Sequence, residues 1–396
     1  MTVDVPDGLT FPVPRRDPFH PPAEYLTAGR MSRCPLGYGG EAWLVNDFQA
    51  TREILADGDS FSADNATAGF PALPMASKRR TPGHFLTMDP PEHTRLRQLV
   101  AAQFTPGRVR TLTPVMRRAV AGLVDGMVKT GSPADLVAEL AVPLPAVTAS
   151  EMLGTPLSDL DFFLRVTQEL QAFEATPAQR VAAAGRMTRY LRAAIEQTHG
   201  GDSLLALLSA HLGGDEGFTM DELIGVANLV IIAGLETTAG LTGLTVLSLL
   251  RDPRQAALVR EDPPRRARAA VHEALRYWTL VQYGIARVAT RDVEVGGRLV
   301  RAGEAVVLNL ATANRDPAEF ASPDTFDITR DARRQLAFGH GMHRCLGAPI
   351  AIAQTELAVA ELMSRLPDLR LAVPEEQLEF RADMLIYGLR SLPVSW

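Results

Sequence analysis

The 396-residue sequence has little cysteine and no excess of positive charge, and each shortage excludes a class of protein. Its two cysteines, Cys34 and Cys345, are too few for a disulfide scaffold and favour a reducing cytoplasm. With 40 Lys and Arg against 46 Asp and Glu, the formal net charge of −6 excludes a nucleic-acid-binding protein held by overall positive charge. The 46% of hydrophobic and 22% of charged residues are typical of an ordinary globular protein.

Membrane signals are also scarce. The N-terminus has no basic stretch followed by an apolar core, so we expect neither a signal peptide nor a membrane anchor. The longest apolar run, Leu223 to Leu235, contains Asn228 and ends at Glu236, whereas a membrane-spanning helix needs about 20 apolar residues. The sequence therefore predicts a soluble, cytoplasmic protein with no membrane and no nucleic-acid partner.

No repeat, Gly/Ser linker or charge block divides the chain, which indicates a single domain over residues 1–396. The apolar spacing is mostly helical from about residue 89 to 276, and it predicts helices over 108–128, 178–198 and 264–277. Short strand patterns lie near the ends of the chain, at 42–45, 293–295, 298–310 and 369–373. The predicted fold class is mainly α with small β-sheets.

One long helix has clear boundaries. Thr219 and Glu222 have the spacing of a capping box, and Asp252-Pro253 follows the last apolar residue, Leu250. Because the segment is apolar on nearly every side, we expect a buried central helix of roughly 45 to 50 Å. Its few polar residues therefore need a function or a partner.

The most informative stretch runs from Phe338 to Gly347, with the sequence FGHGMHRCLG. Its glycines allow a tight turn, and the apolar run 346–362 predicts a helix that begins at Cys345, whose N-terminal N–H groups favour a thiolate. A small buried cysteine is the plain alternative. Zinc bound by His340, His343 and Cys345 lacks a fourth ligand, and a nucleophilic cysteine lacks an evident base.

The pattern FGxGxHxCxG resembles the haem-binding signature of the cytochrome P-450 superfamily, and the similarity extends over nearly the whole chain. Glu273-Ala-Leu-Arg276 is similar to the E-x-x-R motif of the family, and residues 314–317 and 326–330 resemble the segment before the haem loop. The resemblance implies a cytochrome P-450 fold with the long central helix over haem b (iron protoporphyrin IX). It also implies that Cys345 is the axial iron ligand and that Phe338 and Gly339 border the cofactor.

His93 and Arg97 lie four residues apart, so a helix after Asp89-Pro-Pro would place both on one face. Two such groups suit an anionic ligand, although a solvated helix face is the plain alternative. In the family this H-x-x-x-R pair binds the haem propionates, and the resemblance gives Arg287 and His343 the same role.

The central helix contains Ala233-Gly-Leu-Glu-Thr-Thr238. Gly234 costs up to about 1 kcal/mol of helix stability but leaves room for a small ligand, and Glu236 is expensive in an apolar helix unless it is partnered or functional. A Glu on a crevice-facing turn is the alternative. The resemblance implies that Gly234, Glu236 and Thr237 are catalytic, with Glu236 and Thr237 relaying protons to bound oxygen.

The implied activity is that of a monooxygenase, which inserts one oxygen atom of O2 into a mostly apolar small molecule of secondary metabolism. Ferredoxin and ferredoxin reductase would supply the electrons, docking near Arg344 with Arg95 and Arg333 or Arg334. Oxidative coupling or ring formation, a haem sensor, and a thiol or zinc hydrolase are the alternatives. The resemblance places eight residues in the substrate pocket: Phe85, Leu86, Phe173, Val230, Ala233, Val281, Ile285 and Ile386.

Overall fold

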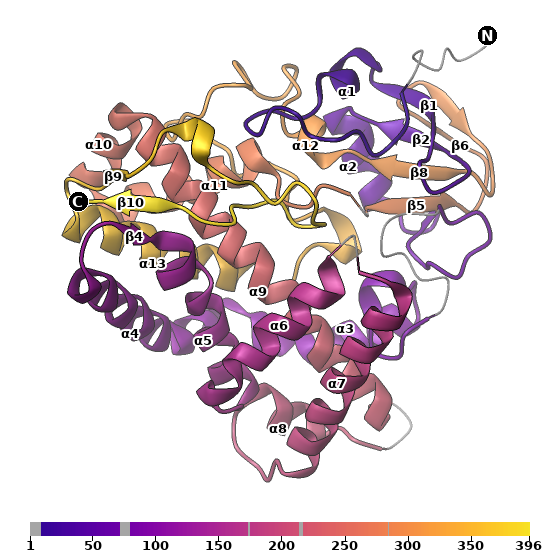
Figure 1. Cartoon of the computed structure of the whole chain (residues 1–396). Helices are drawn as coiled ribbons and strands as arrows, with labels where there is room; N and C mark the ends of the chain where they lie inside the picture. Colours follow the sequence, from indigo (N-terminus) through magenta and orange to yellow (C-terminus); the bar gives the residue numbers. More distant parts are fainter. Residues whose placement is uncertain (1–8, 72–79, 173–174, 214–216, 284) are drawn as a thin grey trace.

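The computed structural model of the chain describes residues 9–71, 80–172, 175–213, 217–283 and 285–396. A β-rich region lies at one side of the molecule, and helices make up the larger remaining part (Figure 1). This arrangement confirms the predicted class, mainly α with small β-sheets.

The helices fill most of the described chain. They are α1 (Ala23–Thr27), α2 (Phe48–Ala56), α3 (Glu92–Ala101), α4 (Pro106–Thr130), α5 (Pro143–Leu153), α6 (Leu160–Gln171), α7 (Pro177–Glu196), α8 (Leu204–Ser209), α9 (Met220–Arg251), α10 (Pro253–Glu261), α11 (Pro263–Trp278), α12 (Leu310–Ala313) and α13 (Ala348–Arg365). The helices predicted over 108–128, 178–198 and 264–277 are α4, α7 and α11, each within two residues of the expected ends.

The strands form three small sheets. The five-stranded sheet has the order β1 (Met31–Pro35), β2 (Glu41–Val45), β8 (Ala305–Leu308), β5 (Ala286–Ala289) and β3 (Phe61–Ser62). The three-stranded sheet has the order β4 (Ala134–Asp135), β10 (Pro393–Ser395) and β9 (Arg370–Leu371), and β6 (Val293–Val295) pairs with β7 (Arg298–Val300). The single strand predicted over 298–310 is wrong, because a turn at Gly303, with φ +82°, separates β7 from β8 and sends them to different sheets.

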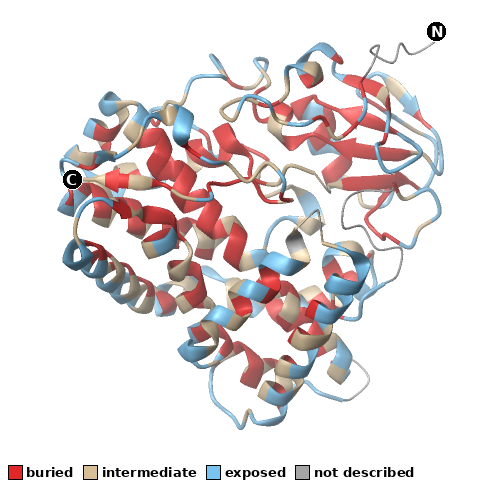
Figure 2. Ribbon diagram, in the orientation of Figure 1, coloured by how far each residue is buried: buried red, intermediate tan, exposed pale blue. Residues whose placement is uncertain are grey.

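Helix α9 runs through the middle of the helical region and is buried along most of its length (Figure 2). It begins with the predicted capping box: Glu222 N–H donates to the Thr219 hydroxyl (3.2 Å), and Thr219 N–H donates to Glu222 Oε2 (2.8 Å). By length and composition α9 would also pass as a membrane span, but 67% of its most apolar window is buried inside the protein. This burial is typical of the central core helix that the sequence predicts.

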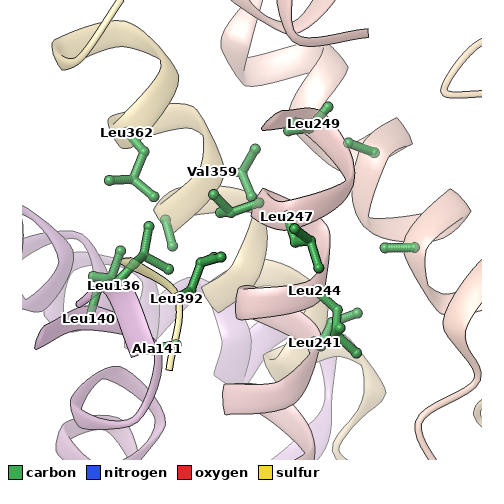
Figure 3. Close-up of a cluster of buried hydrophobic side chains, with 14 of the residues drawn as sticks. Leu136, Leu140, Ala141, Leu241, Leu244, Leu247, Leu249, Val359, Leu362 and Leu392 are labelled. Atoms are coloured by element: carbon green, nitrogen blue, oxygen red, sulfur yellow. The ribbon is translucent and has the colours of Figure 1, made fainter. Parts of the chain in front are cut away.

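The core around α9 joins segments that are far apart in the sequence. Leucines of α9 lie beside Val359 and Leu362 of α13 and beside Leu392 near the C-terminus (Figure 3). A hydroxyl contact of 3.2 Å between Thr242 of α9 and Thr355 of α13 also joins these two helices. Because the cysteine loop leads directly into α13, this packing fixes the loop relative to α9.

A buried ion pair on α11 anchors the segment before the cysteine loop. Arg276 donates to both carboxylate oxygens of Glu273 (2.7 and 2.8 Å), and both side chains are fully buried. Arg276 also donates to the carbonyl oxygens of Asn314, Pro323 and Thr325. The Asn314 side chain in turn accepts a bond from Leu336 N–H (2.7 Å), next to the loop. The Glu273–Arg276 pair therefore anchors the segment that leads into the cysteine loop.

Two predicted helix starts are wrong. Helix α13 begins at Ala348 instead of Cys345, because the Cys345 N–H bonds back to Phe338 O and keeps the cysteine in the loop. Helix α3 begins at Glu92, and Asp89 does not cap it. The Asp89 carboxylate instead accepts bonds from the Ser62 hydroxyl and from Ala63 N–H, beside β3.

Candidate functional site

The cysteine loop, residues 338–347, is a tight turn closed by backbone hydrogen bonds. The Cys345 N–H donates to Phe338 O (2.8 Å), and Gly339 N–H donates to Leu336 O (2.8 Å). Gly339 and Gly341 both have φ +69°, a conformation that favours glycine. A Cβ at Gly341 would lie 2.2 Å from Leu55 O of α2, so the loop also needs glycine there to approach α2.

The Cys345 side chain lies just before the N-terminus of α13. Solvent reaches it from one side, yet dense protein surrounds it, and this burial raises the pKa of the thiol. The N–H groups of Gly347 and Ala348 and the charges of Arg344 and Arg97 act in the opposite direction and favour the thiolate. A metal cation at the sulfur would favour the thiolate in the same way and deprotonate the thiol.

Four basic side chains gather beside this loop. His93 and Arg97 come from α3, Arg287 from β5 and His343 from the loop itself, and the rings of the two histidines lie 4.2 Å apart. Arg97 donates to Arg344 O, which ties α3 to the loop. The structure therefore brings together all four residues that the resemblance assigns to the propionates.

The cluster lacks acidic partners of its own. Among the described residues, no carboxylate forms an ion pair with Arg97 or Arg287, and neither ring nitrogen of His93 or His343 has a hydrogen-bond partner. Burial, together with the charges of Arg287, His93 and Arg97, lowers the pKa of His343 to about 3. Burial also lowers the pKa of Arg287 to about 10. Such a site is matched by an anionic ligand that brings its own carboxylates.

Helix α9 has one open stripe along its otherwise buried surface. Val230, Ala233, Gly234 and Thr237 are partly or fully exposed, although most of α9 is buried, and their spacing places them on one face. A Cβ at Gly234 would meet no described atom within 4 Å. The Thr237 hydroxyl donates to Ala233 O (2.6 Å), the preceding turn of the helix. The stripe combines small size, apolar surface and one hydroxyl group.

Glu236 has a partner that the sequence did not indicate. Its side chain is only 3% exposed and forms an ion pair with Arg381, whose side chain is 11% exposed. Arg381 belongs to the turn between β9 and β10 and lies in no recognisable motif, so no pattern in the sequence signals this pair. The pair meets the expectation that a Glu in an apolar helix needs a partner.

The predicted substrate residues fall into three groups. Val281 and Ile386 are brought together by a β-bridge, and Ile285 lies just before β5. Phe85 is buried, and its ring centre lies 6.3 Å from that of His93, whereas Leu86 is 47% exposed. Val230 and Ala233 lie on the open stripe of α9. Phe173 lies outside the described residues.

The arginines predicted for partner docking differ in their availability. Arg95 pairs with Glu222, Arg333 with Asp331, and Arg334 with Glu319. Arg344 is exposed, and no acidic side chain in the described part of the chain pairs with it. Burial lowers the pKa of His340 beside it, and the charges of Arg52 and Arg344 lower that pKa further.

The zinc alternative finds no support in the geometry. Within the ranges that the structure describes, no group of three or more His, Cys, Asp or Glu side chains is arranged to hold a metal ion. The residues present fit a different ligand. It would offer a transition-metal ion to the Cys345 sulfur and carboxylates to the four basic side chains.

Comparisons with known proteins agree over the whole chain. The cytochrome P-450 family model matches residues 266–379. Vitamin D3 dihydroxylase of Streptomyces griseolus is 38% identical over 404 residues, covering 100% of this chain and 98% of the relative. Nocardicin C N-oxygenase of Nocardia uniformis subsp. tsuyamanensis is 41% identical over 370 residues, covering 92% of each. The crystal structure of CYP105P1 in complex with filipin I has a TM-score of 0.91 at 36% identity, covering 98% of this chain and 99% of that chain.

Proposed function

The chain belongs to the cytochrome P-450 family, and on that premise we propose that it inserts one atom of O2 into a mostly apolar small molecule of secondary metabolism. The overall reaction consumes the substrate, O2, two electrons and two protons, and it yields the oxygenated product and water. The observation that carries this proposal is the set of basic side chains beside the glycine-rich cysteine loop that have no ion-pair partner among the described residues.

The cofactor proposed for this site is haem b, which supplies O2 binding and activation when it is bound. Cys345 would ligate the iron through its sulfur, and the N–H groups at the start of α13 would stabilise the thiolate charge. Phe338 and Gly339 shape the cysteine loop and would border the haem. His93, Arg97, Arg287 and His343 would hold the propionates, which gives each buried basic group the anion that it lacks.

The stripe on α9 supplies the groups for oxygen chemistry. Gly234 leaves space beside the helix, and Thr237 offers a hydroxyl within that space. We propose that Thr237 orders the water that delivers protons and that Glu236, its neighbour in the sequence, supplies them. Ala233 and Val230 continue the stripe as apolar surface for the substrate.

The substrate class follows from the apolar lining. The proposed pocket residues Phe85, Val281, Ile285 and Ile386 are hydrocarbon or aromatic, so they would bind an apolar molecule by burial. The relatives named for vitamin D3 and nocardicin C carry different substrates in their names, and this variety supports the class without selecting one molecule.

We propose that a cytoplasmic ferredoxin, with its reductase, supplies the electrons. Arg344 and Arg52 offer unpaired positive charge next to the cysteine loop, which suits an acidic partner. If the partner docks there, raising the ionic strength should slow the first electron transfer, and the charge reversal Arg344→Glu should slow it further. A rate that is indifferent to both changes would exclude this surface.

The relay is tested by Thr237→Ala. We expect this variant to accept electrons as the wild type does but to release much of the reduced oxygen as hydrogen peroxide. The measurement is NADH consumed against product and peroxide formed, using a reconstituted ferredoxin chain and a compound selected by its low-to-high spin shift. Glu236→Gln should lower turnover and change the solvent isotope effect, with less peroxide than Thr237→Ala releases.

A matched control exists on the same helix. Thr245 donates to Leu241 O (2.6 Å), the same intrahelical bond that Thr237 makes, but it is fully buried. Thr245→Ala should therefore keep the wild-type ratio of product to NADH. If Thr237→Ala also keeps that ratio, the hydroxyl is structural and the proposed relay is wrong.

A further inference from the structure

The turn that carries Arg381 is braced against itself and against α9. Phe380 and Leu389 form a β-bridge, and Arg381 N–H donates to Gly388 O (2.8 Å). The backbone of this turn, residues 380–389, touches α9 at Gly240: a Cβ at Gly240 would lie 2.9 Å from Tyr387 O, and one at Gly388 would lie 3.3 Å from the Gly240 Cα. Two glycines thus permit a close backbone contact.

Glu236 and Gly240 lie four residues apart on α9 and therefore on one face of the helix. That face contacts the turn twice, through the glycine contact at Gly240 and through the Glu236–Arg381 ion pair. The side chain of Arg381 thus reaches Glu236 from a turn whose backbone packs on the same face of α9. The position of the turn determines the position of the Glu236 carboxylate.

The same turn is also a wall of the proposed pocket. Met384 forms a β-bridge with Ala172, just after α6, and Ile386 forms one with Val281. Gln282 N–H donates to Leu385 O (3.1 Å), and its side-chain amide donates to Met384 O (2.7 Å). A displacement of this wall would therefore carry Arg381 with it.

The two groups assigned to the proton relay do not contact each other in this arrangement. The Thr237 hydroxyl donates a hydrogen bond to Ala233 O, and the Glu236 carboxylate forms its ion pair with Arg381. A charge-assisted pair at such low exposure is held firmly, because separating its partners leaves a buried charge without compensation. While the ion pair is closed, the Glu236 carboxylate stays at Arg381.

We propose that Arg381 is a positioning residue that holds the Glu236 carboxylate on the pocket wall and away from Thr237. Proton delivery by Glu236 then requires the pair to open, and movement of the turn 380–389 is what opens it. This inference rests on the proposed role of Glu236 as the proton donor. A purely structural ion pair would alter stability alone and would leave proton-dependent kinetics unchanged.

The test follows how fast the haem-loaded, dithionite-reduced protein returns to the ferric spectrum in air-saturated buffer, in H2O and in D2O, without substrate. Arg381→Gln should accelerate this return about threefold to tenfold and make it sensitive to D2O, because Glu236 is released. Arg381→Lys should stay within about twofold of the wild type, since it keeps the charge. The ferrous–CO spectrum of each variant checks that the haem is loaded.

Two further variants make the test specific. Arg390→Gln removes an ion pair with Asp383 in the same turn, with side chains 47% and 48% exposed, and should leave the rate unchanged. The double variant Arg381→Gln with Glu236→Gln should return at the rate of Glu236→Gln alone, because no acid remains to be released. If Arg381→Gln fails to load haem, Arg381→Met carries the test, because it also removes the charge, and it should show the same acceleration and D2O effect.

Two outcomes would overturn the inference. One is an Arg381→Gln rate equal to the wild-type rate, and the other is an acceleration that persists in the double variant. Failure of the proposed relay would appear separately, as a Glu236→Gln enzyme with wild-type turnover and solvent isotope effect during product formation. The two failures are therefore distinguishable.

Discussion

Replacing Arg287 by methionine should have opposite effects on the haem-free and the haem-loaded protein. Arg287 is 8% exposed, lies on the inner strand β5 between β8 and β3, and has no ion-pair partner among the described residues. Methionine carries no charge and fills the space of the aliphatic part of the Arg287 side chain. The substitution thus removes a buried charge that is useful only when an anion is bound beside it.

The magnitude follows from the pKa. Burial lowers the pKa of Arg287 from its ordinary value to about 10, and at about 1.4 kcal/mol per pKa unit the charged side chain costs at most about 3.5 kcal/mol. The variant also loses the hydrogen bond from Arg287 to Ala286 O, worth about 1 kcal/mol. We therefore expect Arg287→Met to raise the free energy of unfolding of the haem-free chain by about 2 kcal/mol. Loss of a buried partner should weaken haem retention by about 3 kcal/mol, a factor of roughly one hundred.

The assay has two arms. Guanidinium unfolding of the haem-free protein measures stability, and haem transfer to excess apomyoglobin measures retention. Arg301→Met is the matched control, because Arg301 pairs with Asp292 at the surface, with side chains 68% and 55% exposed; it should change neither quantity appreciably. A variant Arg287→Met that destabilises the haem-free chain and retains haem as the wild type does would refute the reasoning.

Three other substitutions test parts of the fold and the site. Gly341→Ala should prevent stable haem uptake, measured by the Soret absorbance after reconstitution, because φ +69° and the contact with Leu55 O both oppose a Cβ. Arg276→Met leaves the buried Glu273 with Arg330 as its remaining ion-pair partner, so guanidinium unfolding should show a loss of up to about 3 kcal/mol; a loss below about 1 kcal/mol would contradict the anchoring role. Burial lowers the pKa of His93 from 6.5, so below pH 6.5 the unfolded chain takes up a proton that the haem-free native protein resists. The contribution of His93 to the free energy of unfolding should be constant above pH 6.5 and fall below it by at most about 1.4 kcal/mol per pH unit. Burial also lowers the pKa of His84, His272, His340 and His343, so the total slope is steeper, and His93→Phe should remove only the share of His93.

Local sequence signals predicted the helices and the cysteine loop well. The Thr219–Glu222 capping box gives the start of α9, because both of its hydrogen bonds lie within four residues of each other. The glycines of the loop indicated the turn, and two of them do have positive φ. The failures at Cys345 and Asp89 have different causes. Cys345 is held by Phe338 O within its own loop, whereas Asp89 is held by Ser62 and Ala63, which are distant in sequence.

Ion pairs between residues far apart in the sequence could not be predicted from the sequence. Nothing near Glu236 indicates that Arg381 would reach it, since the pair depends on how the turn 380–389 packs on α9. The ion pairs that occupy Arg95, Arg333 and Arg334 could not be foreseen for the same reason. By contrast, the resemblance to a known family named His93, Arg97, Arg287 and His343 together, and the structure does place them side by side.

The central claim is that Cys345 ligates a haem iron as a thiolate, and the reduced, CO-bound spectrum tests it most directly. The purified wild-type protein should show the strongly red-shifted band that thiolate ligation gives. Cys345→Ser should keep much of the fold and lose that band, because an alcohol does not ionise near neutral pH. Retention of the band by Cys345→Ser, or its absence from the haem-loaded wild type, would contradict the account.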